Sequence, residues 1–577
     1  MTTFLKTYGV VLEKIEIYTK RVMHMKQIYL DIMEKSLSAY SDERIKEYIE
    51  EVKRDGLKEH GFPRLAANMG ILIAYGRRTE LFDTFIEMMD ICCEEMPRKK
   101  AANDFSIREV CCCLMLLEKK QILKKEFFEK WKARLTAFDP WNFYSVVDDN
   151  SGNFVANWAM FAAVSEYMRG VFCGIDTTAF VDWQIPSQLA NLDLNDMYQD
   201  DPPFSNHIVY DIVPRFLIAF LLRAGYKGKY AERLEQVLDN TADITLKMQS
   251  VTGELAFGGR SNQFLNNDPM LSSYYEMEAA RFFEKGDITR AKQFKAAALL
   301  AAKATLNYLN LTPISHIKNR YDISSKIGCE EYGYFNKYMI TVASNVYIGL
   351  LFSNNAIVPS VAPAEQGGYV ISTSDRFHKT FLSAGSYHIE IETNADFHYD
   401  ANGLGRVHKG GCPSALCLSV PFTSTPNYIL EGRNLVPMSI CCYAENNGKI
   451  LVGAERYAQY CLKDSRSNEE KAEAVFDVKL PFNVTVTQKY IVSKNGVDIL
   501  LSGYEKIGFM LPVFDFDGNV NTEITINENK IAVEYQGFVC VYKFNGDIDT
   551  DFKYFYNRNG RYKVFMIKSK YLKIEIK

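Results

Sequence analysis

Several kinds of feature are missing from this chain of 577 residues, and each absence excludes a class of protein. No apolar run reaches about 18 residues, so no membrane-spanning helix is predicted. The net charge is −4, and no long lysine and arginine tract or P-loop is present, so a nucleic-acid partner is not expected. No C-x-x-C pair or cysteine and histidine cluster has structural-zinc spacing, so no metal is predicted.

Cysteine occurs thirteen times, but not in the pattern of a disulfide framework. The contiguous groups Cys92-Cys93, Cys111-Cys112-Cys113 and Cys441-Cys442 lie in apolar segments, and the total is odd. We therefore expect reduced, buried thiols. The N-terminus does not show the pattern of an export signal, which together with the cysteines favours a cytoplasmic protein. Secretion is the alternative if the N-terminus has been trimmed.

Residues 1–353 have the hydrophobic periodicity of successive amphipathic helices. Turn signals at Asp139-Pro140, Ala224-Gly225 and Thr312-Pro313 divide them into hairpin-like pairs. The expected helices include Arg64–Tyr75, Glu80–Met96, Ser106–Lys119, Asn157–Val171, Val213–Ala224, Tyr230–Gln249 and Ile288–Leu309. So many helices in one segment favour an (α/α) toroid, an incomplete barrel, over a simple bundle.

The pattern changes at residues 354–368, where Pro359, Pro363 and Gly367-Gly368 indicate a linker. From residue 369 to residue 577, period two replaces period 3.6, and the chain is rich in valine, isoleucine, threonine and aromatic residues. Turns such as Asn495-Gly496 and Asn559-Gly560 separate the runs. The predicted fold class is multidomain α and β, with the toroid followed by an antiparallel β-sandwich.

An amide, an imidazole and a phenol lie within five residues at Asn206, His207 and Tyr210. These groups can carry out proton abstraction without a metal or cofactor. His207 is expected just before a helix that has Pro214 in its first turn. If helical geometry begins earlier, Tyr210 shares a face with His207. The alternatives are a histidine bonded to a loop carbonyl and a tyrosine that packs in the core.

The pair Asn157-Trp158 follows a polar loop and opens an apolar helix. Trp158 can stack on a sugar ring, and Asn157 can donate hydrogen bonds to a ligand. The alternative is a helix N-terminus capped by Asn153, with Trp158 packed in the core, and we prefer it for Trp158.

A glycine pair precedes an arginine at Gly258-Gly259-Arg260, and Asn262 follows. Such a turn brings the backbone close to a ligand, and Arg260 can bind a carboxylate or sulfate through two hydrogen bonds. The alternative for Arg260 is a salt bridge to Glu254 or Asp268. Downstream, Tyr274 and Tyr275 supply further phenols.

The β-region contains one dense polar run, from Glu390 to Arg406. It includes Glu392, Asn394 and His398, and it is expected to form a long loop between strands. We expect these three side chains to contribute to substrate binding, with His398 facing the toroid. A solvated connection is the alternative.

In this order, the motifs resemble those of polysaccharide lyases built as an (α/α) toroid followed by β-sheets. The chondroitin AC, hyaluronate and xanthan lyase family is the nearest resemblance, and heparinase II/III-like proteins are its relatives. The matching pieces are Asn157-Trp158, the run from Asp201 to His207, Gly259-Arg260 and Glu392-Thr393-Asn394. The resemblance implies metal-independent β-elimination at a uronic acid, with no cofactor and an acidic oligosaccharide or polysaccharide as substrate.

The chain departs from the family at the tyrosine, which lies further beyond the histidine where this chain has Phe216. Tyr210 is therefore the first candidate, with Tyr274 or Tyr275 as alternatives. Under this resemblance Asn157 and Arg260 neutralise the substrate carboxylate. His207 or a tyrosinate removes the proton, and Tyr210 protonates the leaving oxygen.

Two other functions remain open. The first is a glycoside hydrolase on the same scaffold, which needs two carboxylates; the candidates are Asp148, Asp149, Glu254, Asp268 and Glu276. The second is a glycan-binding protein without catalysis. If the chain is cytoplasmic, the expected substrate is an imported oligosaccharide.

Overall fold

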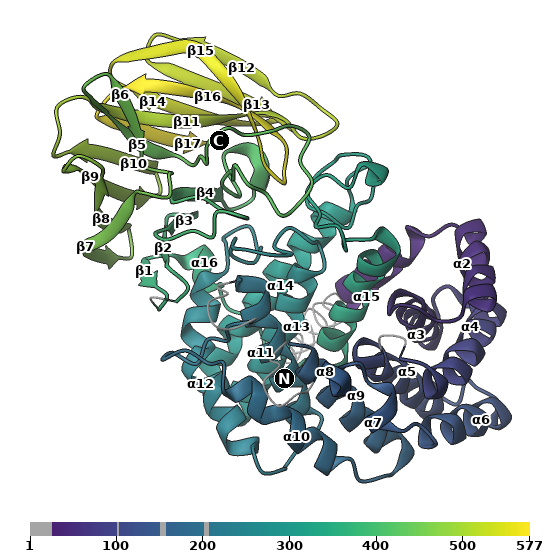
Figure 1. The fold of residues 1–577 in the computed structure, drawn as a ribbon. Helices are drawn as coiled ribbons and strands as arrows, with labels where there is room; N and C mark the ends of the chain where they lie inside the picture. The colour runs from purple at the N-terminus through teal and green to yellow at the C-terminus, as the bar shows by residue number, and fades with distance from the viewer. Residues whose placement is uncertain (1–25, 101–102, 150–156, 201–206, 375) are drawn as a thin grey trace, which may run out of the picture.

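The computed structural model describes residues 26–100, 103–149, 157–200, 207–374 and 376–577. Helices occupy the first part of the chain and strands the last part (Figure 1). Residues 26–38 are helical. The other described α-helices are α2 (Asp42–Asp55), α3 (Gly61–Ala74), α4 (Phe82–Glu95), α5 (Ile107–Lys119), α6 (Lys125–Thr136), α7 (Pro140–Phe143), α8 (Val146–Asp149), α9 (Trp158–Cys173), α10 (Thr178–Leu189), α11 (Ile208–Arg223), α12 (Ala231–Met248), α13 (Asn267–Glu284), α14 (Ile288–Leu309), α15 (Phe335–Phe352) and α16 (Pro363–Gln366).

Among these described helices, α3, α5, α9, α11, α13 and α15 contact one another in that order, and α15 also packs against α3. Helices α4, α6, α10, α12 and α14 pack on the inner helices from outside. The inner position explains why every residue of α3 is buried, because a helix that contacts neighbours on all sides has no solvent face. This arrangement is the predicted (α/α) toroid.

Local signals define several helix ends. Ser41 accepts a hydrogen bond from the Arg44 N–H at the start of α2, and Asp287 accepts one from the Arg290 N–H at the start of α14. Helix α11 differs from the prediction, because it begins at Ile208 and encloses Pro214 within the helix. The burial of Ile208, Val209 and Ile212 stabilises the earlier start.

The strands form three antiparallel sheets within the described residues. The first has the order β1 (Tyr369–Ser372), β2 (Lys379–Ala384), β3 (Tyr387–Glu392) and β4 (Gly403–Lys409). The second has the order β12 (Glu523–Asn527), β13 (Lys530–Tyr535), β14 (Phe538–Phe544), β17 (Tyr571–Ile576), β10 (Gly496–Ser502), β9 (Val484–Ser493), β8 (Lys471–Leu480) and β7 (Gln459–Asn468). The third has the order β15 (Asp547–Tyr556), β16 (Arg561–Lys568), β11 (Ile507–Phe516), β5 (Cys441–Asn446) and β6 (Lys449–Val452).

The eight-stranded sheet contacts both of the others: β8 contacts β2 of the first sheet, and β9 contacts β5 of the third. Strand β9 alternates buried and half-buried residues along its length, as expected for a strand with one face in the core. The predicted order of a helical toroid followed by antiparallel sheets is confirmed.

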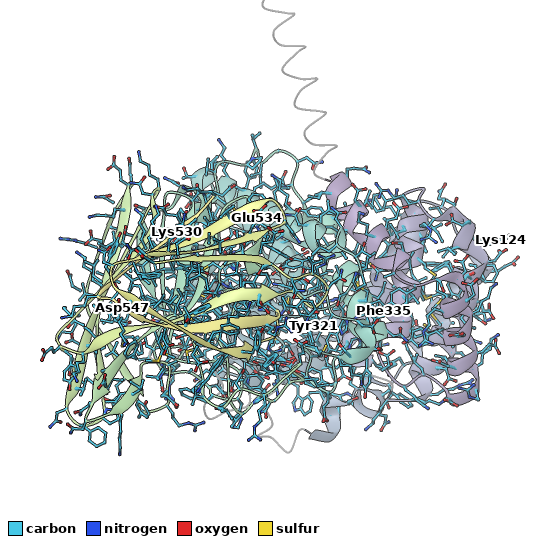
Figure 2. The ribbon with its side chains drawn as sticks, turned by 90° about the horizontal axis from the view of Figure 1, so that it is seen from above. Lys124, Tyr321, Phe335, Lys530, Glu534 and Asp547 are labelled. Atoms are coloured by element: carbon cyan, nitrogen blue, oxygen red, sulfur yellow. The ribbon has the colours of Figure 1, made fainter. Side chains whose placement is uncertain are left out.

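The segment between α14 and α15 joins the two regions. Seen from above, the labelled Tyr321 and Phe335 lie between the sheets and the earliest helices (Figure 2). The Tyr321 hydroxyl donates to Glu431 at 2.7 Å, and Arg320 forms an ion pair with Asp517 at 3.1 Å. This segment therefore links the toroid to the β-region by polar contacts, in addition to the chain connection that follows α15.

All thirteen cysteines are free thiols, and ten of them are buried. Burial raises the pKa of thiols such as Cys111 and Cys113. In the described part of the chain, no helix has the length and apolar character needed to span a membrane.

Candidate active site

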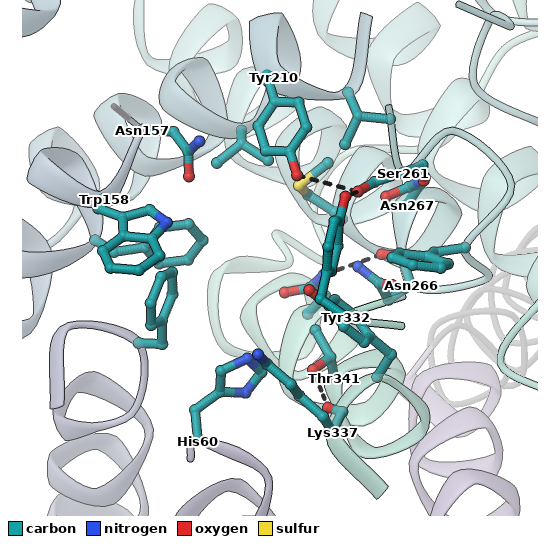
Figure 3. Close-up of a pocket in the computed structure, with 18 of the residues that line it drawn as sticks. His60, Asn157, Trp158, Tyr210, Ser261, Asn266, Asn267, Tyr332, Lys337 and Thr341 are labelled. Carbon is teal, nitrogen blue, oxygen red and sulfur yellow. Dashed lines mark hydrogen bonds between the residues drawn. The ribbon is translucent and has the colours of Figure 1, made fainter. Parts of the chain in front are cut away.

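A cavity of about 670 Å³ lies among the inner helices of the toroid (Figure 3). Its lining includes Arg64 from α3, Trp158 from α9, Tyr210 from α11 and Met270 from α13. Lys337, Thr341 and Asn345 line it from α15. A volume of this size is typical of small-molecule and cofactor sites.

The start of α11 places Tyr210 in the cavity wall. His207 is the residue before the helix, and its backbone is extended. Tyr210 follows in the first turn, and the two ring centroids lie 6.2 Å apart. Tyr210 is among the described residues that line the cavity, and His207 is not. The His207 residue is 7% exposed, and its ring centroid lies 5.1 Å from that of Tyr399.

The turn that precedes α13 supplies Arg260 and Ser261 to the cavity. Gly258, Gly259 and Ser261 all have positive φ angles, of 147°, 77° and 61°. Glycine adopts such angles readily, but a serine in the left-handed region costs free energy, and it persists there only when its surroundings hold it.

Four backbone N–H groups of this turn are held by side chains from distant parts of the chain. The pairs are Phe257 to Glu390 at 3.0 Å, Gly259 to Asp400 at 2.8 Å, Arg260 to His207 at 3.3 Å and Ser261 to Glu330 at 2.7 Å. Glu390 lies in β3 and Asp400 in the loop between β3 and β4, so the β-region contributes to the shape of the turn.

The hydrogen bond to His207 determines which tautomer the ring adopts. Because the Arg260 N–H is a donor, His207 Nδ1 must accept, and the neutral ring carries its proton on Nε2. Burial, and the positive charges of Arg260 and Arg558, lower the pKa of His207 to about 3. The imidazole is therefore neutral at physiological pH and is a donor through Nε2.

A buried carboxylate connects Arg260 to Asn157. Asp200 is 1% exposed and forms an ion pair with Arg260 at 2.8 Å. The backbone N–H of Asn157 donates to Asp200 at 3.0 Å, and its side-chain amide donates to the same carboxylate at 3.2 Å. Arg260 thus pairs with Asp200, and not with Glu254 or Asp268 as the alternative prediction had it. The amide of Asn157 is directed to Asp200 in this structure.

The Tyr210 hydroxyl belongs to a chain of three hydroxyl groups. Ser261 Oγ lies 3.0 Å from the Tyr210 hydroxyl and 2.6 Å from that of Tyr332. The Arg260 guanidinium carbon lies 4.5 Å from the centre of the Tyr210 ring. Burial raises the pKa of Tyr210, and the charge of Arg260 and the hydrogen bond with Ser261 act to lower it.

The cavity wall has an excess of positive charge. Five cationic side chains and two carboxylates line it among the described residues. The cations are Lys58, Arg64, Lys100, Arg260 and Lys337, and the carboxylates are Glu59 and Asp200. An excess of fixed positive charge in a concave site favours an anionic ligand.

The other candidates predicted in the helical region occupy different places. Trp158 lines the cavity and is 39% exposed, with its ring 5.1 Å from that of Phe105. Asn262 lies in the turn, where it donates to the Ala256 carbonyl at 2.8 Å. Tyr274 and Tyr275 are fully buried in α13 and do not line the cavity. Asn206 lies outside the described residues.

The candidates predicted in the β-region do not line the cavity. Glu392 is buried and accepts from Lys379 at 2.8 Å. Asn394 is exposed near His378, and the exposed His398 ring bonds to the Thr425 carbonyl at 3.1 Å. The loop does reach the toroid, but through Tyr399 and Asp400.

The carboxylates proposed for a hydrolase are engaged elsewhere. Glu276 is fully buried and bound to Lys295 at 2.6 Å. Asp268 is bound to Lys318 at 2.7 Å, and Glu254 lies 3.7 Å from the same ammonium. None of these three lines the cavity. The side chains of Asp148 and Asp149 lie outside the described part of the structure.

The sequence did not predict several residues of the site. Asp200 directly precedes the run from Asp201 to His207, but nothing in the sequence indicates that it meets Asn157 and Arg260. Tyr332 lies between Glu330-Glu331 and Gly333-Tyr334. This polar and aromatic run between helices could have indicated a functional loop. His60 and Lys337 lie 277 positions apart in the chain and gave no signal.

No protein-family model matches this chain, and no curated protein matches it. It is similar to the structure of Streptomyces coelicolor A3 chondroitin AC lyase in complex with chondroitin sulphate, with 10% identity over 96% of this chain and 82% of that chain and a TM-score of 0.45. It is similar to Paenibacillus xanthan lyase, with 9% identity over 89% of this chain and 52% of that chain and a TM-score of 0.46, so it spans about half of that protein. Heparinase III follows, with 10% identity over 82% and 76% of the two chains and a TM-score of 0.36. At these identities the likeness concerns the fold and no residue's role.

Proposed function

We propose that this protein is an oligosaccharide or polysaccharide lyase that cleaves a uronate-containing glycan by β-elimination without a metal. The observation that supports this most directly is the Tyr210 hydroxyl in the wall of a cationic cavity, beside Arg260 and Ser261. A phenol next to a fixed positive charge can act as both base and acid, because the charge stabilises its phenolate.

The reaction begins with neutralisation of the uronate carboxylate by Arg260, which makes the proton at C5 more acidic. The Tyr210 phenolate takes this proton, and the electron pair of the C5–H bond forms the C4=C5 double bond. The C4–O bond breaks, and the leaving oxygen takes the proton from the Tyr210 hydroxyl. The products are an unsaturated uronate and a sugar with a free hydroxyl group.

The neighbouring residues hold this arrangement. Asp200 fixes the guanidinium of Arg260 and the amide of Asn157 on one carboxylate. His207 accepts the Arg260 N–H, and its Nε2–H is available as a donor. In this assignment His207 is a positioning residue, and Tyr210 is the base.

A hydrolase is less well supported, because a proton donor and a second carboxylate are required. The carboxylates that line the cavity among the described residues are Glu59 and Asp200. Asp200 is bound by Arg260 and Asn157, and Glu59 accepts from the Gly61 N–H at 2.7 Å and from the Tyr48 hydroxyl.

The test is ultraviolet absorbance during incubation with a panel of uronate-containing oligosaccharides, with reducing ends measured in parallel. The native protein should generate the absorbance of the conjugated unsaturated uronate, and Tyr210→Phe should lower the rate by about 10²- to 10⁴-fold. Tyr554→Phe, at an exposed position on β15, is the matched control. New reducing ends without the absorbance would instead identify a hydrolase.

A further inference from the structure

The cavity has two chemically different ends. Tyr210, Ser261 and Asn157 lie at one end, and His60, Lys337 and Thr341 lie at the other (Figure 3). The proposed elimination uses the first end only. The second end is built by the start of α3 and by α15, which contact each other where the ring closes.

His60 presents an unused hydrogen-bond donor at this second end. Its ring is buried, with 4% of the residue exposed, and it lines the cavity. The Arg64 guanidinium donates to Nδ1 at 3.0 Å, so the neutral ring carries its proton on Nε2. Within the described part of the chain, Nε2 has no hydrogen-bond partner. This nitrogen is on the cavity wall, so its N–H is available to a ligand that enters the cavity.

Lys337 adds a positive charge beside His60. It lies in the first turn of α15, lines the cavity and is half-buried. In the described residues, no carboxylate lies within 4 Å of its ammonium group. Burial lowers the pKa of Lys337, and the charge of Glu59 acts in the opposite direction. Lys58 lines the same wall and pairs with Asp55 at 3.1 Å.

The terminal nitrogens of the arginine at this end have protein partners. Arg64 donates to the Thr341 hydroxyl and to the Phe105 carbonyl, each at 2.9 Å, and lies 3.3 Å from Glu109. These contacts hold the guanidinium against the protein. The remaining donors, His60 Nε2 and the lysine ammonium groups, are point donors, which suit a compact oxyanion.

We infer that this second end is a binding site for a second anionic group of the substrate, a sulfate ester or a second carboxylate, held by His60, Lys337 and Lys58. The inference rests on the proposed function in placing the reacting uronate at the Tyr210 end. It extends that function by assigning the substrate class: a glycan with two anionic groups, one on the reacting uronate and one on a neighbouring sugar.

The experiment is isothermal titration calorimetry with three disaccharides that have the uronate at the non-reducing end. No glycosidic bond leaves C4 in such compounds, so binding is measured without elimination. The first carries a neutral second sugar, the second carries a sulfate ester on that sugar, and the third carries a second uronate. The proteins are the native chain, Lys337→Gln, Lys58→Gln and the control Lys506→Gln, whose position is 66% exposed on the β-region.

We expect the doubly anionic disaccharides to bind the native protein about tenfold more tightly than the neutral one. Lys337→Gln should remove this difference and leave the affinity for the neutral disaccharide within about twofold, whereas Lys506→Gln should change nothing. Comparison of the sulfated and the diuronate compounds identifies which oxyanion is preferred. Lys58→Gln gives the same comparison at an exposed position if Lys337→Gln does not fold.

Three results would overturn the inference. They are equal affinity of the native protein for all three disaccharides, equal weakening of all three by both variants, and no binding of any of them. Failure of the proposed function has a different signature. In that case the doubly anionic disaccharides bind with the expected dependence on Lys337, but longer oligosaccharides give no ultraviolet absorbance.

Discussion

The backbone N–H of Gly259 donates to the carboxylate of Asp400 at 2.8 Å, which joins the turn that carries Arg260 to the loop between β3 and β4. Both groups are buried. The contact makes the β-region part of the candidate active site, although the cavity itself is lined by the helical part of the chain among the described residues.

Asp400→Asn should change how stability depends on pH. Burial raises the pKa of Asp400 to about 7. Between its ordinary value of 3.8 and this value, the folded protein holds a proton that the unfolded chain has lost. The free energy of unfolding of the native protein therefore falls, through this group, as pH rises across that window. Asparagine retains an acceptor for the Gly259 N–H but does not titrate.

The measurement is denaturant unfolding of both proteins from pH 4 to pH 8. The stability of the variant relative to the native protein should increase with pH, by on the order of 4 kcal/mol at most. A difference that does not vary with pH would contradict the assignment of a protonated Asp400 in the folded state.

Gly259→Ala should displace His207. A Cβ at this position would lie 2.1 Å from His207 Nδ1 and 3.0 Å from the His207 Cα atom, at a φ of +77°. We expect a loss of stability of about 2 kcal/mol or more, and a loss of activity, because the turn cannot keep Arg260 in place.

Gly286→Ala is the matched control for that variant. Its φ is +83°, and a Cβ there meets nothing within 4 Å. The stability loss of Gly286→Ala therefore reports the cost of the left-handed backbone alone, about 1 kcal/mol. If both variants lose the same stability, the contact with His207 contributes nothing.

The pH profile of kcat/KM distinguishes the two candidate bases. Burial raises the pKa of Tyr210, so the phenolate fraction increases with pH through the alkaline range, and the rate should increase with it. If His207 were the base, the profile would be flat above about pH 4, because its pKa is lowered to about 3. Initial rates measured from pH 5 to pH 10, on a substrate that gives the absorbance, decide between them.

Arg260→Lys should retain charge but lose activity. The guanidinium lies over the Tyr210 ring and bonds to Asp200, and an ammonium group cannot make both contacts with the same geometry. We expect kcat/KM to fall by about 10²- to 10³-fold. Arg466→Lys, at an exposed arginine that pairs with the buried Glu473, is the control and should retain full activity. Activity near that of the native protein in Arg260→Lys would show that only the charge matters.

The elements with strong periodicity were predicted well. Helix α14 has the predicted bounds, and α12 differs by one residue at each end, because each has a continuous amphipathic pattern. The start of α11 was predicted five residues too late. Pro214 was treated as a first-turn residue, but burial of the preceding residues extends the helix to Ile208.

The candidate site was predicted in part. Tyr210, Asn157, Trp158 and Arg260 do line one cavity, although they are separated by up to 103 positions in the sequence. Tyr274 and Tyr275 were plausible alternatives by sequence, but the inner position of α13 buries both of them. A helix that is covered on every side leaves no pattern that distinguishes a cavity face from a core face.

The sequence by itself determined the order of a helical region and a β-region, and it supplied the residue types suited to proton abstraction near an anion. These follow from periodicity and from functional groups, which are local properties. Only the tertiary structure decided that Asp200 joins Arg260 to Asn157, that Asp400 holds the turn, and that His60 and Lys337 form a second polar end of the cavity. Those contacts join residues far apart in the chain, and their positions depend on how the ring of helices closes and on where the sheets pack against it.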